Sequence, residues 1–150
     1  MKKDSKNKLG RSLEFFQPDY ATDCELPLFI ARVAAGFPSP ADDYVEGRLD
    51  LNKHLIKHPA ATYFVKAIGD SMIDAGIHSG DIMIVDRSLE ATDNKVVIAV
   101  LHGEFTVKRI KKIKGKLFLA PENDKYEPIE VNEDSDCELW GVVTNVIHPL

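Results

Sequence analysis

The chain has 150 residues, a formal net charge of −5 and a hydrophobic content of 44%. This length suits one domain with an additional arm, and the hydrophobic content is sufficient for a modest core. The acidic composition argues against a free-standing DNA-binding protein, so we expect no direct sequence-specific DNA binding. The sequence shows neither a signal peptide nor an apolar run of membrane-spanning length, and we therefore expect a cytoplasmic protein with no membrane association.

The two cysteines, Cys24 and Cys137, lie far apart and lack the paired spacing of a zinc or redox motif. A disulfide-stabilised secreted scaffold is therefore excluded. We predict that both cysteines are free thiols, as in a reducing cytosol.

Residues 1–35 are predicted to form an N-terminal arm. The aromatic pair Phe15-Phe16 follows a polar start and is a candidate for docking this arm. Residues 28–37 are apolar and extended in character, and the prolines that follow prevent a helix from continuing. A small-residue junction such as Ala35-Gly36 fits a protease cleft, which binds its substrate as an added β-strand. The alternative is an interdomain linker.

Residues 40–58 predict a turn followed by a helix. Asp50 is suited to cap the start of this helix, because its side chain can accept a hydrogen bond from a free backbone amide. The spacing of the apolar residues places Leu51, Leu55 and Ile56 on its buried side.

His54 and His58 are four residues apart, a spacing that suits two metal ligands on one helix face. No acidic or cysteine partner completes the pair in the sequence, so we expect a solvated face. We therefore predict no metal site and no cofactor.

From residue 61 onward the pattern is that of β-strands. Short apolar or alternating runs are separated by turn residues, and His102-Gly103 predicts a tight hairpin. Many short strands with little helix predict a mostly β protein with antiparallel strands. The predicted strands are 63–67, 81–86, 95–101, 104–110, 116–120, 129–131 and 138–147.

Ser71 and Lys108 are the candidate catalytic residues. Ser71 follows a strand-like run and a Gly-Asp turn, and Lys108 alternates with apolar residues in a predicted strand. A serine hydroxyl needs an adjacent base, and a lysine serves as that base only when burial keeps it neutral. The alternative is a turn serine and a solvated strand lysine.

The motifs that surround both residues occur in a distinctive order. They are Ala35-Gly36-Phe37-Pro38-Ser39-Pro40-Ala41, Gly69-Asp70-Ser71-Met72, Gly80-Asp81-Ile82-Met83-Ile84-Val85-Asp86, Gly103-Glu104-Phe105-Thr106-Val107-Lys108 and Trp140-Gly141-Val142-Val143. From about residue 26 onward this order resembles the LexA/UmuD family of self-cleaving serine peptidases, peptidase family S24, and most closely its UmuD branch. Residues 1–25 match no part of the pattern.

The resemblance implies a curled antiparallel sheet, the β-clip fold, with a short helix and a flexible N-terminal arm. It also implies Ser71 as nucleophile, Lys108 as general base and cleavage between Ala35 and Gly36. Backbone N–H groups at Ser71 and Met72 are candidates for stabilising the oxyanion. Self-cleavage would divide the chain into the arm, 1–35, and a peptidase-like domain, 36–150.

The resemblance further implies a bacterial role in the SOS response to DNA damage. A RecA filament on single-stranded DNA would stimulate cleavage. The processed homodimer would then join the UmuC error-prone polymerase, as part of polymerase V, in translesion synthesis.

Three other functions stay open at this stage. One is a fragment of a LexA-type or phage-type repressor, although no helix-turn-helix domain fits before residue 36. The second is a non-catalytic binding module in which Ser71 and Lys108 are structural. The third is a protease that acts on other proteins.

Two charged runs have alternative interpretations. The basic run at 108–116 is either a patch that contacts DNA or an acidic partner, or a solvated hairpin. The acidic run at 130–138 is either a solvated loop or the complement of that patch in a dimer.

Overall fold

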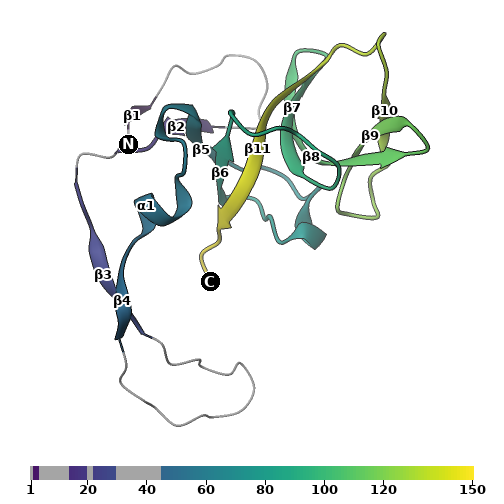
Figure 1. The fold of residues 1–150 in the computed structure, drawn as a ribbon. Helices are drawn as coiled ribbons and strands as arrows, with labels where there is room; N and C mark the ends of the chain where they lie inside the picture. The colour runs from purple at the N-terminus through teal and green to yellow at the C-terminus, as the bar shows by residue number, and fades with distance from the viewer. Residues whose placement is uncertain (1, 4–13, 20–21, 30–44) are drawn as a thin grey trace. The chain divides into compact units, whose positions relative to one another are not determined.

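The computed structural model describes residues 2–3, 14–19, 22–29 and 45–150. The chain divides into two compact units (Figure 1), one comprising Met1–Pro18 with His58–Leu150 and the other Asp19–Lys57. The larger unit contains an extended sheet and two short 3₁₀ turns, η1 (Pro59–Ala61) and η2 (Ile73–Ala75). Its strands are β1 (Lys2–Lys3), β2 (Glu14–Gln17), β5 (Thr62–Lys66), β6 (Ile82–Asp86), β7 (Val96–Leu101), β8 (Glu104–Ile113), β9 (Lys116–Ala120), β10 (Ile129–Val131) and β11 (Cys137–Ile147).

The sheet has the order β1-β2-β5-β6-β11-β7-β8-β9-β10, and neighbouring strands are antiparallel. The long strand β11, yellow in Figure 1, pairs with β6 and with β7. Its register shifts between Leu139 and Gly141 and again between Val143 and Asn145. Such irregularities bend a strand and increase its twist, which suits a curled sheet. The predicted mostly β, antiparallel fold class is confirmed.

Each of the seven strands predicted from the sequence is present. The main difference in extent is at β8, which continues three residues beyond its predicted end at Ile110. His102 and Gly103 join β7 to β8 with φ values of +50° and +78°. Positive φ at both central residues is typical of the tight turn that matches the twist of a hairpin, so this prediction is confirmed.

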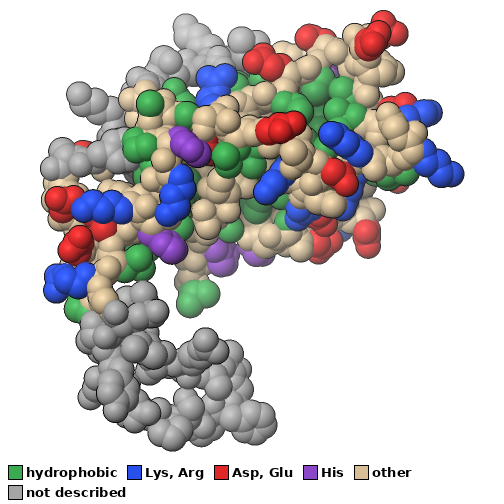
Figure 2. All heavy atoms as spheres, in the orientation of Figure 1, with side chains coloured by type: hydrophobic (Ala, Val, Ile, Leu, Met, Phe, Trp, Pro, Cys, Tyr) green, Lys and Arg blue, Asp and Glu red, His purple; other side chains and the backbone are tan. Residues whose placement is uncertain are grey.

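The basic run lies on the β8–β9 hairpin, whose turn is Lys114-Gly115. Lys116 forms an ion pair with Glu130 of the acidic run at 3.5 Å. On the face shown in Figure 2, basic and acidic side chains of the larger unit are interspersed. These observations favour the solvated hairpin, and the dimer contact stays a prediction.

Two apolar clusters form the core. The first contains Val65, Ala67, Met72, Ile77, Met83, Val85 and Ile98, and the second contains Val97, Ala99, Ile110, Leu119 and Val142. Successive residues of β7 join different clusters because side chains alternate between the two faces of a strand. Both faces of the central strands are therefore covered.

Strand β2 (Glu14–Gln17) lies within the predicted N-terminal arm and belongs to this sheet. It pairs with β5, placing Phe15 opposite Val65. The Phe15 ring lies 4.9 Å from that of Phe105 and 5.1 Å from that of Trp140. The expected aromatic anchor is thus confirmed for Phe15.

The smaller unit is a hairpin of β3 (Glu25–Phe29) and β4 (Val45–Asp50), followed by α1 (Leu51–Leu55). Here the prediction was partly wrong, since residues 45–50 form a strand. Pairing with β3 satisfies their backbone groups, an interaction that local sequence does not reveal. The helix is also short, and Leu51 is 58% exposed although it was predicted to be buried.

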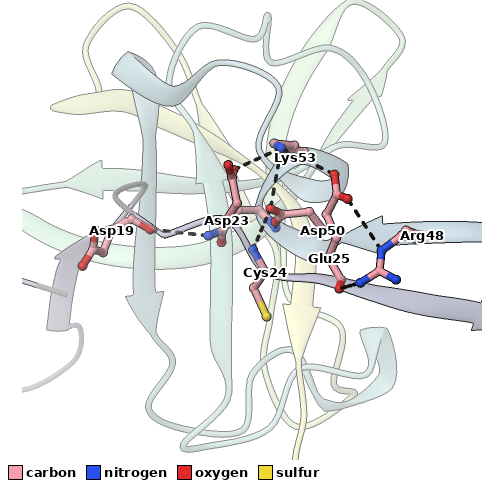
Figure 3. A network of polar contacts seen from close by, with 8 residues as sticks. Asp19, Asp23, Cys24, Glu25, Arg48, Asp50 and Lys53 are labelled. Carbon is pink, nitrogen blue, oxygen red and sulfur yellow. Dashed lines mark hydrogen bonds and ion pairs between the residues drawn. The ribbon is translucent and has the colours of Figure 1, made fainter.

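Asp50 caps the helix as predicted, since its carboxylate accepts a hydrogen bond from the Asn52 amide at 2.9 Å. The same carboxylate accepts a hydrogen bond from the Cys24 amide (Figure 3). That hydrogen bond lowers the pKa of Asp50 despite the opposing effect of burial. Lys53 pairs with Asp23 at 3.1 Å and lies 3.7 Å from Glu25, so this network ties α1 to the segment that leads into β3.

Both cysteines are free thiols as predicted, with Cys24 exposed and Cys137 partly buried. Burial raises the pKa of the Cys137 thiol, and Asp136 contributes in the same direction. None of the helices in the described residues combines the length and apolar character needed to cross a membrane.

Candidate active site

Ser71 lies in a turn after β5, at the surface end of the first core cluster. Gly69 adopts a φ of +99° in this turn, a conformation that residues with a side chain rarely accept. Ser71 is partly buried, and Met72 behind it is 3% exposed within the core. The buried Met72 anchors the turn and leaves the serine hydroxyl at the protein surface.

Lys108 lies in the middle of β8 and pairs with Val97 of β7. Lys108 is 9% exposed, and its Nζ is 3.3 Å from the Ser71 Oγ. The same nitrogen lies 2.7 Å from the Thr106 Oγ1 and 3.0 Å from the Val107 carbonyl oxygen. The fold therefore brings together two residues that are 37 positions apart in the sequence.

Burial lowers the pKa of Lys108 because the charged ammonium is poorly solvated there. A neutral amine has two N–H donors and one lone pair. It can donate to the Thr106 hydroxyl and to the Val107 carbonyl while its lone pair accepts the Ser71 proton. An ammonium would instead donate to all three oxygens, so these contacts permit both forms, and only the neutral form can act as a base.

A loop after β9 holds the serine turn in place. The Glu122 amide donates to the Ser71 carbonyl at 2.8 Å, and the Asp74 amide donates to the Glu122 carbonyl at 2.9 Å. The Asn123 side chain donates to the Asp70 carbonyl at 2.8 Å. This loop was not predicted from the sequence, because about 50 residues separate it from the serine and no motif links the two segments.

Asp70 receives a further contact from that loop, since the Tyr126 hydroxyl donates to its carboxylate at 2.5 Å. This hydrogen bond raises the pKa of Tyr126.

Thr106 was also missed as a site residue, although alternation had placed it on the face of β8 that carries Lys108.

A pocket with both polar and apolar surface opens beside the serine. It is lined by Ala67, Ile68, Gly69, Ser71, Met72, Ile77, Phe105, Thr106 and Val107. Within the described part of the chain, the amides of Ser71 and Met72 donate no hydrogen bond. The role of these two amides in stabilising the oxyanion stays a prediction.

The two histidines considered as metal ligands, His54 and His58, are not part of this arrangement. Ala35 and Gly36 lie outside the described residues. His54 is exposed on α1. The Nδ1 of His58 lies 2.5 Å from the carboxylate of the buried Asp86, a partner that the sequence did not reveal. Burial acts to raise the pKa of Asp86, but hydrogen bonds from Ser88 and His58 lower it overall.

Comparison with known proteins identifies the family. A model of the Peptidase S24-like family matches residues 27–144. Protein SamA of Salmonella typhimurium strain LT2 is 50% identical over 122 residues, covering 81% of this chain and 84% of SamA. Protein MucA of Escherichia coli is 41% identical over 128 residues, covering 83% of this chain and 87% of MucA.

The LexA repressor of Pseudomonas chlororaphis is 40% identical over 126 residues, covering 83% of this chain and 61% of the repressor. The family match extends over most of the chain and includes Ser71 and Lys108. The resemblance to the LexA/UmuD family is thus confirmed, and the chain belongs to the Peptidase S24-like family.

Proposed function

We propose that this chain is a self-cleaving serine endopeptidase in which Lys108 activates Ser71. The observation that carries the proposal is the 3.3 Å contact between a buried amine and a serine hydroxyl, in a chain of a peptidase family. Desolvation supports the role of Lys108, because only a neutral amine can take the serine proton.

The reaction is an acyl transfer. Lys108 takes the proton of Ser71, and the Ser71 Oγ attacks the carbonyl carbon of the substrate. The amides of Ser71 and Met72 stabilise the oxyanion that forms. As this intermediate collapses, Lys108 gives its proton to the leaving amine and an ester to Ser71 remains. Water then attacks the ester with Lys108 again as base, which frees the serine.

The proposed substrate is the bond between Ala35 and Gly36 of the same protein. The apolar side chains that line part of the pocket beside Ser71, among them Ile68, Ile77 and Val107, suit the small apolar residues around this bond. A tethered substrate needs no second binding event, so the rate depends on how often the arm is correctly docked. Cleavage would divide the chain into two fragments, residues 1–35 and residues 36–150.

In the cell, we propose an accessory role in error-prone DNA synthesis during the bacterial SOS response. A RecA filament on single-stranded DNA would favour the docked arm, and the processed homodimer would bind a UmuC-type polymerase in the cytoplasm. The motif order of the UmuD branch supports this role, together with the likeness to SamA and MucA over more than four fifths of each protein.

Self-cleavage of the purified chain tests the peptidase proposal. The wild type, Ser71→Ala and Lys108→Ala would be incubated at neutral and alkaline pH, with and without activated RecA. Matched controls are Ser135→Ala in a distant loop and Lys112→Ala, an exposed lysine on the same strand as Lys108. We expect a fragment that begins at Gly36 from the wild type and both controls, and intact chains from the two site variants.

An uncut wild type in the presence of activated RecA would refute the peptidase proposal and leave a non-catalytic binding module. Cleavage that persists in Ser71→Ala would assign the activity to another residue. The cellular role has a separate test, in which the purified 36–150 product is examined for dimerisation and for binding to a UmuC-type polymerase. If the uncut chain binds the polymerase and the 36–150 product does not, activation by cleavage is contradicted.

A further inference from the structure

Three potential metal ligands, none of them part of the serine–lysine pair, meet in the larger unit. Asp81 immediately precedes β6, and His148 immediately follows β11. Ile82 and Ile147 are opposite each other in the antiparallel pair, so the register brings Asp81 and His148 together across 67 residues of sequence. Figure 1 shows the C-terminal tail leaving β11 beside β6.

Asp81 is the fixed centre of this group. It is 2% exposed, and its Oδ2 accepts a hydrogen bond from the His78 amide at 2.8 Å. Its Oδ1 lies 2.6 Å from the His148 Nδ1. Each carboxylate oxygen therefore faces a different histidine, in a buried position that limits rotation of the carboxylate.

The second feature of this group is the hydrogen bonding of the His78 side chain. Among the described residues its Nδ1 has no hydrogen-bond partner, although this atom is buried. The nearest carboxylate oxygen, the Asp81 Oδ2, is 3.7 Å away, which is too far for a hydrogen bond. A buried polar atom without a partner is uncommon and calls for an explanation, and a bound ion supplies one.

The two imidazole rings converge on the carboxylate. Their centroids are 4.6 Å apart, and the ligand atoms of His78, Asp81 and His148 all lie within 4.8 Å of one another. Ligands at about 2.0–2.1 Å from a tetrahedral zinc ion are roughly 3.3 Å apart. The exposed His148 and the partly buried His78 can reach such positions by side-chain rotation around the fixed carboxylate.

We propose that His78, Asp81 and His148 form a binding site for a transition-metal dication of the zinc type. Two imidazole nitrogens and one carboxylate oxygen are ligands typical of zinc, cobalt and nickel, whereas magnesium and calcium require mostly oxygen ligands. A fourth position stays open for water or another ligand. The proposal of this metal site does not rest on the proposed self-cleavage.

The bound ion would connect the C-terminal tail to the turn that leads from Ser71 into β6. This turn contacts the pocket region through the backbone, since the Gly80 amide donates to the Ala67 carbonyl and the Ala67 amide donates to the Asp81 carbonyl. A metal at about 100 times its dissociation constant shifts the folding equilibrium about 100-fold toward the folded state. The expected consequence is a more stable protein with an anchored tail.

Calorimetric titration of the full chain with Zn²⁺ tests the site. The titration would be made on Cys24→Ser, which removes the exposed thiol as a competing ligand. In this background we expect one equivalent of Zn²⁺ to bind and the melting temperature to rise. His78→Gln and His148→Gln should each weaken binding at least ten-fold, and His54→Gln, an exposed histidine of α1, should leave it unchanged.

The proposal is overturned if the Cys24→Ser chain binds no Zn²⁺, or if His148→Gln binds it as tightly as the parent. His148 is exposed, so its replacement by glutamine tests the site even if the His78 variant fails to fold. If His54→Gln is the only variant that weakens Zn²⁺ binding, the metal binds at another site. Preference for Mg²⁺ over Zn²⁺ would also contradict the assigned ligand chemistry.

Discussion

The rate of self-cleavage should rise with pH because the proposed base acts only as a neutral amine. Lys108 is 9% exposed, and its burial lowers its pKa below the ordinary value of 10.5. A lysine of ordinary pKa is neutral in about one molecule in 1,000 at pH 7.5. Each unit by which burial lowers the pKa increases that neutral fraction about ten-fold.

The assay follows the loss of full-length chain by intact mass from about pH 6 to pH 11, with circular dichroism at each pH to confirm folding. The logarithm of the first-order rate constant should increase by about one per pH unit. It should level off at the pKa of Lys108 in the folded protein, below 10.5. Lys112→Ala should reproduce this profile, because Lys112 is exposed and lies outside the site.

Two results would refute the reasoning. A plateau at or above 10.5 would mean that Lys108 is not desolvated. A rate that does not change with pH while the protein stays folded would mean that no amine titrates in the reaction. Lys108→Arg provides a further check, since a guanidinium stays charged throughout this range and should abolish cleavage at every pH.

Three further predictions concern residues around the site. Lys108→Met should raise the melting temperature at neutral pH. The pKa of Lys108 is lower in the folded chain than in the unfolded chain, so wild-type stability rises by about 1.4 kcal/mol for each pH unit between the two pKa values, and the variant should lose this slope. Thr106→Val removes a hydroxyl 2.7 Å from the Lys108 amine and should slow cleavage about two- to ten-fold, whereas Thr106→Ser should retain the rate. After cleavage, residues 1–35 should co-elute with the domain in gel filtration because β2 pairs with β5. Phe15→Ala should release the cleaved fragment by removing the aromatic anchor. Release of the fragment from the wild type would contradict the anchor.

The strands of the larger unit were predictable because each carries its own local signal. Alternation and apolar runs marked β5 to β11, and His102-Gly103 marked a hairpin whose positive φ values only a few residue types accept. The hairpin of β3 and β4 lacked such a signal. Residues 45–50 contain Gly47 and three charged side chains, so their strand conformation depends on pairing with a distant segment.

The site was predictable only where a motif marks it. Ser71 and Lys108 stand in motifs, but the loop that holds the serine turn does not. Glu122 and Asn123 contact residues 70–74 because β8, β9 and their neighbours adopt a particular register, which local sequence does not specify. The same reason explains why His148 could not be connected with Asp81 in advance.

The arrangement of charges around Lys108 is consistent with its proposed role as a neutral base. A carboxylate close to the amine would favour the ammonium form and oppose the effect of burial. Glu122, in the loop after β9, lies in this region because its amide donates to the Ser71 carbonyl. Its side chain is bound by Arg109, which also donates to the Asn94 carbonyl at 2.6 Å. Because adjacent residues of a strand point to opposite faces, Arg109 directs the carboxylate away from the face that carries Lys108. The adjacent positions 108 and 109 thus carry two basic side chains in different environments: burial lowers the pKa of Lys108, whereas Arg109 forms an ion pair with Glu122.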